Sequence, residues 1–531
     1  MKVSPEAADK RSNSILFVDV FEGHAARAHK PSEPGRIRHN KIHEVKSGVR
    51  LPKFDAKALS CGILHLGCGA FHRAHQALAT QRAIEAEGKE GLRWGIAAAS
   101  MTRATVPDQL RPQNGLYTAL ERSKDGTKAE IAAVLREIIH APSDARGLPA
   151  RIADPQTKIV TLTITPTGYL LEPSSGRLMA RHKDIQHDLL HPLRPRSAVG
   201  AIALGLERIY DDGGRPPVII SCDNISENGR TLHDAVVSFA SLRSARLADW
   251  IHRNVHFPNT MVDRIVPTSS AADREDAFRL TGLVDAAPVS MEPFLQWVIE
   301  EFPGPRPRWE AAGAQFVSNV ATYELAKLRM LNGVHMLLAY LGGLAGYKTI
   351  AETMADPYFA ACAEHFMLRE QGATLDMPAE KLRDYAAVLM ERLRNPAIRH
   401  DVSRIGRNGS CKMATRLVRS LQENLDAGRS AQCTILAIAG WISWFTLRDG
   451  KARALTLTDP RREALLAVAA MAGEDPQIQA RKFLGQAEIF GAEIQEQESV
   501  VQELAGALKD LRELPVNEVL RRRLAFCHPA H

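Results

Sequence analysis

Short apolar runs alternate with helical segments along the first part of the chain. From Cys61 onward, apolar runs occupy positions 63–66, 94–98, 159–165 and 218–221, and segments with helical spacing separate them. Strands that are joined by helical crossovers lie parallel in one sheet. The pattern therefore predicts an α/β domain with a doubly wound parallel sheet.

The second part of the chain has a different pattern. A stretch rich in proline and glycine, residues 303–307, interrupts the alternation. Beyond it, apolar residues recur at helical spacing without strand-like alternation, for example in residues 380–393 and 461–471. We therefore expect the α/β domain over residues 55–316 and an all-α domain over residues 317–531.

The first 54 residues show neither pattern. Residues 1–54 mix proline, histidine and basic residues without periodicity, which predicts a poorly ordered extension. Few aromatic residues interleave with the basic ones, so a solvated tail is favoured over an arm that binds nucleic acid.

Composition agrees with a globular protein of two domains. A chain of 531 residues is too long for one hydrophobic core, and its 45% apolar and 24% charged residues are typical of folded proteins. The net charge of +7 suits small anionic ligands at least as well as nucleic acid. The composition thus excludes few functions.

Neither a membrane nor an oxidising compartment is indicated. The N-terminus lacks a secretory pattern, and the apolar stretch 433–445 is shorter than the roughly 20 residues that span a bilayer, so it predicts a buried helix. Seven cysteines form no C-x-x-C pair, which argues against a disulfide framework. We expect a cytoplasmic protein without membrane or nucleic-acid partners.

A G-x-G turn follows the first predicted strand. It lies in residues 63–73 (ILHLGCGAFHR), directly before a helix expected to begin near Phe71. Backbone N–H groups at such a turn, with the helix N-terminus, hold the pyrophosphate of a dinucleotide in Rossmann-type domains. An ordinary strand-to-helix turn is the alternative. The residues expected at the cofactor are Gly67, Gly69, Ala70, Phe71 and Arg73, with Ser100 from the second strand.

The second strand leaves the choice between NAD and NADP open. A carboxylate usually binds the adenosine 2′-hydroxyl there, yet this strand runs into residues 99–103 (ASMTR), without an acid. Ser100 and Arg103 are compatible with a 2′-phosphate. Nearby histidines and cysteines suggest a metal, but their spacing matches no closed zinc site, so none is expected; they are His65, His72, His75, Cys61 and Cys68.

One predicted helix carries four polar groups. Glu324, Lys327, Asn332 and His335 fall within less than half the circumference of a helix that turns about 100° per residue. Leucines share this arc, and polar groups on an apolar helix are costly unless they are paired or functional. A solvated face is the alternative, and we favour an active site.

These residue types suit hydride transfer to and from an alcohol. The reaction needs a base for the hydroxyl proton and donors for the developing alkoxide. A lysine whose pKa is lowered by burial can be that base, as Lys327 would be. The amide of Asn332 can donate to an oxyanion, and His335 can orient the hydroxyl.

Two further polar segments have open interpretations. Residues 221–229 (SCDNISENG) follow a predicted strand at the carboxyl end where open α/β sheets bind ligands, although asparagine and glycine there also suit a plain turn. Asp263 is either a salt-bridge partner of Arg264 or a residue of the site, and spacing does not decide between them.

Taken together, five blocks resemble the polyol-specific long-chain dehydrogenases, the family of mannitol 2-dehydrogenase and fructuronate reductase. The resemblance runs in order from about residue 60 to about residue 450, in blocks at residues 67–76, 221–224, 257–267, 292–300 and 327–335. Within the family, the blocks look closest to fructuronate reductase.

The resemblance implies a fold and a site. It implies a Rossmann-type N-terminal domain, a mostly helical C-terminal domain, an active site in the cleft between them, and a monomer. It also implies Lys327 as the general base, Asn224 and Asn332 as the oxyanion hole, and His335 as a substrate binder. Glu324 matches the position of the family's proton relay, and the substrate-pocket positions correspond to Asp263, Arg404 and Lys412.

The implied reaction is the reversible reduction of D-fructuronate to D-mannonate with NAD, without zinc. A carboxylate-bearing substrate needs a cation, which Arg404 or Lys412 can supply. The alternatives are a polyol dehydrogenase that acts on fructose and mannitol, and a non-catalytic binding protein with the same fold. The sequence departs from the family at Asn408 and Ala414, where aspartate and proline are common.

Overall fold

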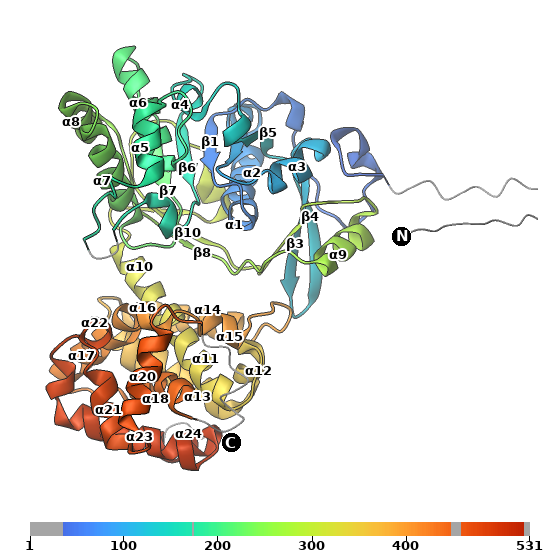
Figure 1. The fold of residues 1–531 in the computed structure, drawn as a ribbon. Coiled ribbons are helices and arrows are strands. Elements are labelled where there is room, and N and C mark those ends of the chain that lie inside the picture. Colours follow the sequence, from blue (N-terminus) through green and yellow to red (C-terminus); the bar gives the residue numbers. More distant parts are fainter. Residues whose placement is uncertain (1–34, 173–174, 448–457, 525–531) are drawn as a thin grey trace, which may run out of the picture.

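The computed structural model describes residues 35–172, 175–447 and 458–524. The chain folds into an α/β part and a helical part, and helix α10 (Ala321–Ala326) leads from one to the other (Figure 1). This confirms the predicted fold class. The exact domain limits stay a prediction, with strand β11 ending at Val317.

A five-stranded parallel sheet forms the centre of the α/β part. Its strand order is β5-β2-β1-β6-β7, and every neighbouring pair is parallel. The strands are β1 (Ile63–Leu66), β2 (Ile96–Ser100), β5 (Leu135–His140), β6 (Ile159–Leu162) and β7 (Val218–Ser221). The chain runs outward from β1 through β2 and then returns to β6, so the strand order reverses between β1 and β6. Open α/β sheets bind ligands at such a point.

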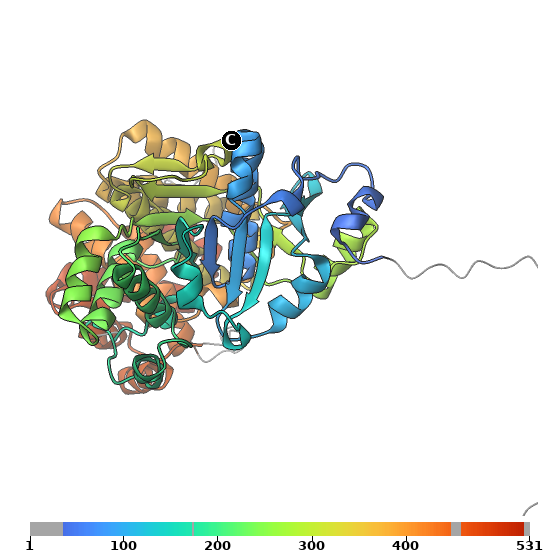
Figure 2. The same ribbon diagram turned by 90° about the horizontal axis from the view of Figure 1, so that it is seen from above.

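Helices cover both faces of this sheet, as Figure 2 shows from above. Side chains of a strand alternate between faces, and accordingly Ile63 joins the core on the side of helix α2 (Gln76–Glu87), whereas Leu64 joins the opposite core with α6 (Ala198–Asp211) and α7 (Asn228–Ser241). The remaining helices of this part are α1 (Ala70–Ala74), α3 (Thr105–Leu110), α4 (Leu148–Ile152), α5 (Lys183–Leu190), α8 (Ala245–Asn254) and α9 (Ala271–Thr281).

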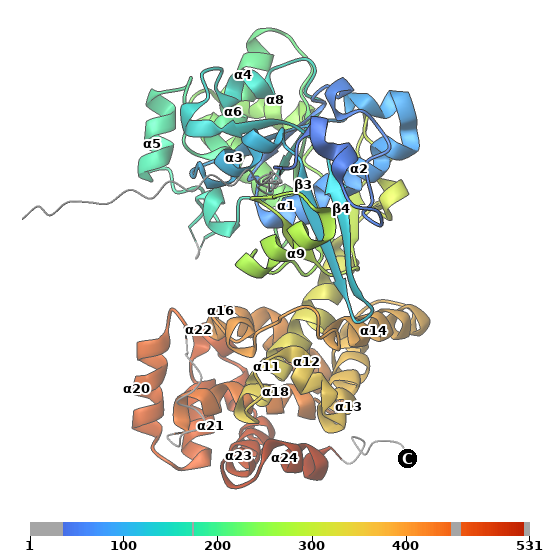
Figure 3. The ribbon, with the colours of Figure 1, turned by 90° about the vertical axis from the view of Figure 1, so that its right-hand side faces the viewer.

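The sequence did not predict two additional three-stranded sheets. One has the order β4-β3-β9, with strands β3 (Tyr117–Ser123), β4 (Gly126–Ala132) and β9 (Val289–Met291). The other has the order β11-β10-β8, with strands β8 (Thr260–Asp263), β10 (Gln296–Glu300) and β11 (Gln315–Val317). The β3–β4 hairpin reaches down to helix α14 (Ala379–Leu393) of the helical part (Figure 3). These sheets bring the α/β part against the helices.

Across the described residues of the helical part, the regular secondary structure is helical. Helix α18 (Gln432–Thr446) is the predicted buried helix, and it packs against α11 (Val334–Leu344) and α23 (Glu498–Glu513). The predicted periodic segments form α14 (Ala379–Leu393) and α20 (Arg462–Ala472). The other helices are α12 (Ile350–Ala355), α13 (Pro357–His365), α15 (Val402–Ile405), α16 (Gly409–Met413), α17 (Arg419–Asp426), α21 (Pro476–Leu484), α22 (Ala487–Phe490) and α24 (Val516–Arg523). None of the described helices combines the length and the apolar character that a membrane span requires.

Part of the expected N-terminal extension is built into the α/β part. Residues 1–34 lie outside the described residues, but Ile37 is fully buried and Arg36 forms a β-bridge with Val284. Arg50 bridges to Glu130 in the same way. For residues 35–54 the expectation of poor order was therefore wrong, because a buried isoleucine and two backbone bridges, to Val284 and to Glu130 of β4, fix them to the α/β part.

Candidate active site

The turn after β1 has a shape that glycine alone permits. Gly67 has a φ of +103°, and a Cβ there would lie 2.1 Å from the carbonyl oxygen of Thr163. At Gly69, by contrast, a Cβ would meet no atom closer than 3.8 Å. The turn is therefore closed against the sheet at Gly67 and open at Gly69, where a ligand can approach the backbone.

Backbone amides of the turn divide into two groups. The N–H groups of Gly67 and Cys68 both donate to the carbonyl of Ala99, at 2.8 and 3.2 Å, and so tie the turn to β2. The first amides of α1, which begins at Ala70, have no helical acceptors because they open the helix. These helical amides, rather than those of the two turn residues, are suited to bind a phosphate.

A cavity of about 660 Å³ lies over this turn at the carboxyl ends of the strands. Its lining includes Gly67, Gly69 and Ser100, three of the residues expected at the cofactor. Arg103 lines it as well, and residues 163–165 contribute from the loop after β6. The cavity thus lies beside the reversal of strand order between β1 and β6.

Three other residues expected at the cofactor lie in helix α1, directly after the turn. Ala70 and Phe71 are half-buried and pack against the core of the α2 side. Arg73 is buried and donates to the carbonyls of Ala287 and Gly69. Its guanidinium thus fixes Gly69 from inside the protein, which differs from the direct contact to the cofactor that the sequence suggested.

Two buried histidines, His65 and His72, pack beside the turn. The His65 ring lies within 3.1 Å of the Gly67 carbonyl and 3.0 Å of the Thr163 hydroxyl, and it stacks on His72. Burial lowers the pKa of His65 to about 3, so the ring is neutral. Among the described residues, no group of three or more His, Cys, Asp or Glu is placed to hold a metal ion.

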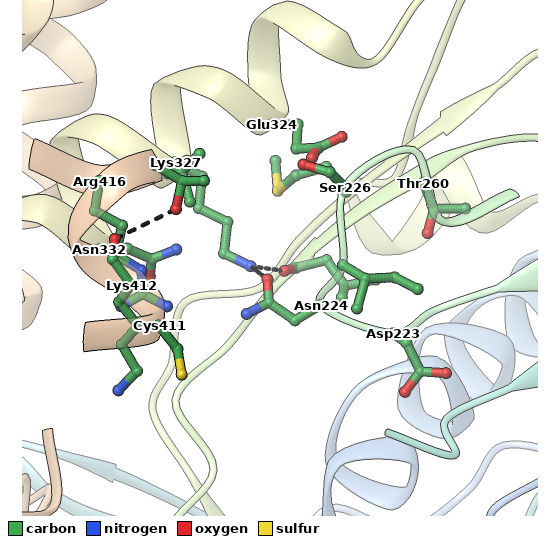
Figure 4. A pocket seen from close by; sticks show the side chains of 15 residues that line it. Asp223, Asn224, Ser226, Thr260, Glu324, Lys327, Asn332, Cys411, Lys412 and Arg416 are labelled. Carbon is green, nitrogen blue, oxygen red and sulfur yellow. Dashed lines mark hydrogen bonds between the residues drawn. The ribbon is translucent and has the colours of Figure 1, made fainter. Parts of the chain in front are cut away.

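A second pocket, of about 210 Å³, contains Lys327 (Figure 4). The loop after β7 contributes Asp223 and Asn224, whereas Asn332 and Lys412 come from the helical part. The pocket is therefore built by both parts of the chain. This is the cleft that the family resemblance implied.

The side chain of Lys327 is buried, and its amine makes two hydrogen bonds to the α/β part. Nζ donates to Oδ1 of Asn224 at 2.7 Å and to the carbonyl of Val262 at 2.6 Å. Burial lowers the pKa of Lys327 from its ordinary value, the nearby Asp263 raises it, and Arg392 and Arg416 lower it further. An amine with three hydrogens keeps one for a further acceptor in the pocket.

Asn224 has a fixed orientation because its oxygen accepts from Lys327. The amide NH₂ group is consequently turned toward the side of the pocket where Asn332 and Lys412 lie (Figure 4). The preceding Asp223 accepts from the backbone N–H groups of Ile164 and Thr165, at 3.1 and 2.8 Å. Because these two residues line the cofactor cavity, Asp223 connects the two pockets.

The helix that carries Lys327 is π-helical from Lys327 to Gly333. The sequence interpretation assumed α-helical spacing, which was wrong for this segment. In a π-helix, hydrogen bonds join residue i to residue i+5 and widen the turn. Two residues that are five positions apart therefore lie closer to the same face of the helix than they would in an α-helix. Asn332 is five residues after Lys327, and both line the pocket. Glu324 lines it too and accepts from the N–H of Glu227 at 3.3 Å.

Asp263 is buried in an ion pair that links the two parts of the chain. It pairs with Arg392 of α14 at 2.6 Å, and Arg392 also binds Glu292 at 2.8 Å. Arg264, the partner considered from the sequence, instead donates to the backbone carbonyls of Ala74 and Glu292. Asp263 therefore lies near Lys327 without lining the pocket.

His335 is buried at the start of α11, two residues after the π-helical segment. Its ring packs edge-on against His400, with 4.7 Å between the centroids, and Nε2 has no hydrogen-bond partner among the described residues. Burial lowers the pKa of His335 well below its ordinary value, and His400 and several arginines lower it further. A neutral ring with an unpaired nitrogen can bind a hydroxyl group.

The two cations expected in the substrate pocket have different positions. Lys412 lines the pocket, and its amine donates to the carbonyls of Arg407 and Ile405. Burial, and next the charge of Arg416, lower the pKa of Lys412 to about 8. Arg404 is exposed on α15 and does not line the pocket.

Sequence reasoning missed one cation of the pocket. Arg416 lines it from a second π-helical segment, η11 (Ala414–Val418), which follows α16. A signal was available, because Arg416 lies four residues after Lys412 and such residues share a helix face. Sequence reasoning also missed Arg392, the ion-pair partner of Asp263, because no short-range pattern connects the two residues.

The fold and the two pockets define the class of protein. The chain is an oxidoreductase of a family that acts on hydroxyl groups of polyols or sugar acids. It has an NAD-type dinucleotide site on a Rossmann-type domain and a buried lysine beside that site. The sequence profile of the Mannitol dehydrogenase Rossmann domain matches residues 61–311, and that of the Mannitol dehydrogenase C-terminal domain matches residues 319–512. The chain belongs to the mannitol dehydrogenase family.

The relatives of this chain are named for different substrates. The chain is 40% identical to D-mannonate oxidoreductase of Escherichia coli over 418 residues, which are 78% of this chain and 85% of the relative. It is 34% identical to mannitol 2-dehydrogenase of Aspergillus fumigatus over 472 residues, 87% of this chain and 93% of the relative. The structure of Pseudomonas fluorescens mannitol 2-dehydrogenase in ternary complex with NAD and D-mannitol superimposes with a TM-score of 0.80, at 34% identity, over 92% of this chain and 99% of that one.

Proposed function

We propose that this protein catalyses the reversible reduction of D-fructuronate to D-mannonate, with Lys327 as the general acid and base. The observation that carries the proposal is the buried amine of Lys327, held 2.7 Å from Asn224 in a pocket that both parts of the chain build. A lysine in this position can exchange a proton with a substrate hydroxyl group.

The proton moves in opposite senses in the two directions. In reduction, the ammonium form of Lys327 donates a proton to the oxygen of the keto group as that oxygen becomes a hydroxyl. In oxidation, the neutral amine accepts the hydroxyl proton. Burial favours the neutral form, and this makes the amine available as a base at a lower pH than an exposed lysine. Glu324 lies three residues before Lys327 and lines the same pocket, and it is suited to pass the proton to water.

The asparagines are suited to bind the reacting oxygen. The NH₂ group of Asn224 is turned into the pocket because its Oδ1 accepts from Lys327, and Asn332 lines the same pocket. Amide donors at these two positions can stabilise an alkoxide as it develops, and the donor of Asn224 is already held in place by Lys327. His335 does not line this pocket, but its neutral ring with an unpaired nitrogen can serve as a partner for a neighbouring hydroxyl group of the substrate.

The dinucleotide, when bound, supplies or takes up the hydride. The open side of Gly69 and the first amides of α1 would hold its pyrophosphate, and the loop after β6 would line its path toward Lys327. We infer NAD as the cofactor, in line with the bound NAD of the mannitol 2-dehydrogenase structure. NADP is the alternative, because Ser100 and Arg103 line the cavity where they could receive a 2′-phosphate, and β2 contributes no carboxylate.

A sugar acid is favoured over a neutral polyol by the charge of the pocket. Lys412 and Arg416 line one side of it, away from the carboxylates of Asp223 and Glu324 that also line it (Figure 4), and two cations on one side suit an anionic substrate. The relative named D-mannonate oxidoreductase supports the same choice. A polyol such as mannitol is the second candidate, which the mannitol 2-dehydrogenase relatives support.

A substrate and cofactor panel tests the proposal. The purified protein would be assayed with NADH and with NADPH against D-fructuronate and D-fructose, following oxidation of the nicotinamide. We expect kcat/KM to be higher for D-fructuronate and for NADH. Equal or faster turnover of D-fructose would contradict the assignment and favour the polyol dehydrogenase.

A further inference from the structure

The cation best placed for the substrate's charged group is one that the family resemblance did not suggest. Arg416 lies on η11, which packs against the π-helical segment that carries Lys327 and Asn332. Its side chain lines the Lys327 pocket together with Asn332 and Lys412 (Figure 4).

The Arg416 guanidinium has no anionic partner in the part of the chain that the structure describes. The ion pairs around this pocket engage other groups, such as Arg392 with Asp263. Among the described residues, no carboxylate forms an ion pair with Arg416; burial lowers its pKa, and the nearby Tyr340 raises it. A cation that is largely withdrawn from water and has no counter-ion is costly, and binding an anion removes that cost.

Neither of the two other cations has this property. Lys412 already donates to the carbonyls of Arg407 and Ile405, and its pKa is lowered to about 8. Arg404 is exposed and lies outside the pocket lining. Arg416, in contrast, is charged throughout the neutral range and can form two parallel hydrogen bonds to a carboxylate.

We propose that Arg416 forms a carboxylate-binding subsite of this pocket and selects sugar acids over neutral sugars. The proposal rests on the proposed function, since the reacting oxygen must lie at Lys327, Asn224 and Asn332. The carboxylate of D-fructuronate lies at the end of the carbon chain away from its keto group. With the keto oxygen at Lys327, the carboxylate extends toward Arg416, with Lys412 beside it.

The test measures the ratio of kcat/KM for D-fructuronate to kcat/KM for D-fructose, with NADH. Removing Arg416 also changes the charge near Lys327, but this affects both substrates, so the ratio isolates the carboxylate contact. We expect Arg416→Gln to lower the ratio about 10- to 100-fold, since a charge-assisted hydrogen bond is lost. Arg416→Lys keeps a cation without the bidentate geometry and should lower the ratio less.

Two further variants serve as comparisons. Arg419→Gln removes an exposed arginine three residues further along, which pairs with Glu423 at 3.8 Å, and should leave the ratio unchanged. Arg404→Gln tests the cation that the family resemblance suggested. Thermal unfolding of each variant shows whether it is folded.

The outcomes separate the two proposals. Equal losses for both substrates in Arg416→Gln and Arg416→Lys, or a larger selective loss in Arg404→Gln, would overturn the subsite and leave the proposed reaction intact. A wild-type enzyme that turns over both substrates equally would contradict the proposed reaction itself, and the subsite with it.

Discussion

At the scale of single residues, the chemistry depends on how burial changes the proton affinity of Lys327. Its side chain is buried, and the two acceptors that its amine contacts, Asn224 and Val262, are both uncharged. Asp263 opposes the effect of burial from nearby, whereas Arg392 and Arg416 reinforce it. The balance lowers the pKa of Lys327, which places a usable base in the pocket.

This balance predicts opposite pH dependences for the two directions. Oxidation of D-mannonate requires the neutral amine, so kcat should rise with pH and level off above the lowered pKa of Lys327, at a pH below that of an ordinary lysine. Reduction of D-fructuronate requires the ammonium form, so kcat should fall over the same range. Initial rates across pH in both directions check this. Profiles that rise together, or a midpoint at the pKa of an exposed lysine, would contradict the assignment.

At the scale of elements, two π-helical segments form one wall of the pocket. Gly333, at the end of the first segment, allows the second to approach, because a Cβ there would lie 3.3 Å from the carbonyl of Arg416 and 3.1 Å from the ring of Phe366. The backbone of Gly333 has helical dihedral angles, with φ of −66°. A side chain at this position is therefore opposed by packing and not by backbone strain.

Gly333→Ala should push these two segments apart. We expect unfolding to become easier by about 1 to 3 kcal/mol, as for an overpacked core, partly offset by the better helix propensity of alanine. Because Asn332 is the neighbour of Gly333, kcat/KM should fall as well. Gly35→Ala, where the new Cβ meets no atom closer than 3.7 Å, is the control. Wild-type stability and activity in Gly333→Ala would show that the close approach is unimportant.

The sequence predicted the elements of the site better than their geometry. The apolar runs identified four strands of the parallel sheet, and the G-x-G turn identified the crossing between β1 and α1. Strand β5 escaped prediction because its residues (LREIIH) mix charged and apolar types, as suits the edge of a sheet. The π-helical segments could not be predicted. Each is only five to seven residues long, and over so few residues the hydrophobic pattern does not distinguish a π-helical turn from an α-helical one.

Long-range contacts were also beyond sequence reasoning. The residues near Lys327 in the chain were identified as a group, and the structure brings Glu324, Lys327 and Asn332 to one pocket with Asn224. Arg404 was taken into the site by resemblance alone, and it is exposed. The partner of Asp263 is 129 positions away, a separation over which no local periodicity carries information.

At the scale of the whole molecule, a buried ion-pair cluster joins the α/β part to the helical part. Arg392 of α14 binds Asp263 and Glu292, and all three side chains are at most 7% exposed. The ring of Phe294 lies 3.9 Å from the Arg392 guanidinium. Since Asp263 follows the carbonyl that accepts from Lys327, the same cluster that joins the two parts also positions the pocket.

Arg392→Met should loosen this junction. Breaking a buried pair leaves the carboxylates of Asp263 and Glu292 without a counter-ion, which costs about 3 to 5 kcal/mol of stability. Unfolding in urea measures this, and kcat/KM should fall together with stability because the pocket spans the junction. Arg399→Met removes an arginine of an exposed pair with Asp401 and should change stability little. Equal effects of the two substitutions would contradict a structural role for the buried cluster.

The central claim is that Lys327 exchanges the proton during hydride transfer, and the rate of Lys327→Ala tests it most directly. Nicotinamide oxidation would be followed with saturating D-fructuronate and NADH, alongside thermal unfolding and nucleotide binding as checks of the fold. The account predicts a loss in kcat of about 10²- to 10⁴-fold with nucleotide binding retained. A folded Lys327→Ala protein that turns over at the wild-type rate would contradict it.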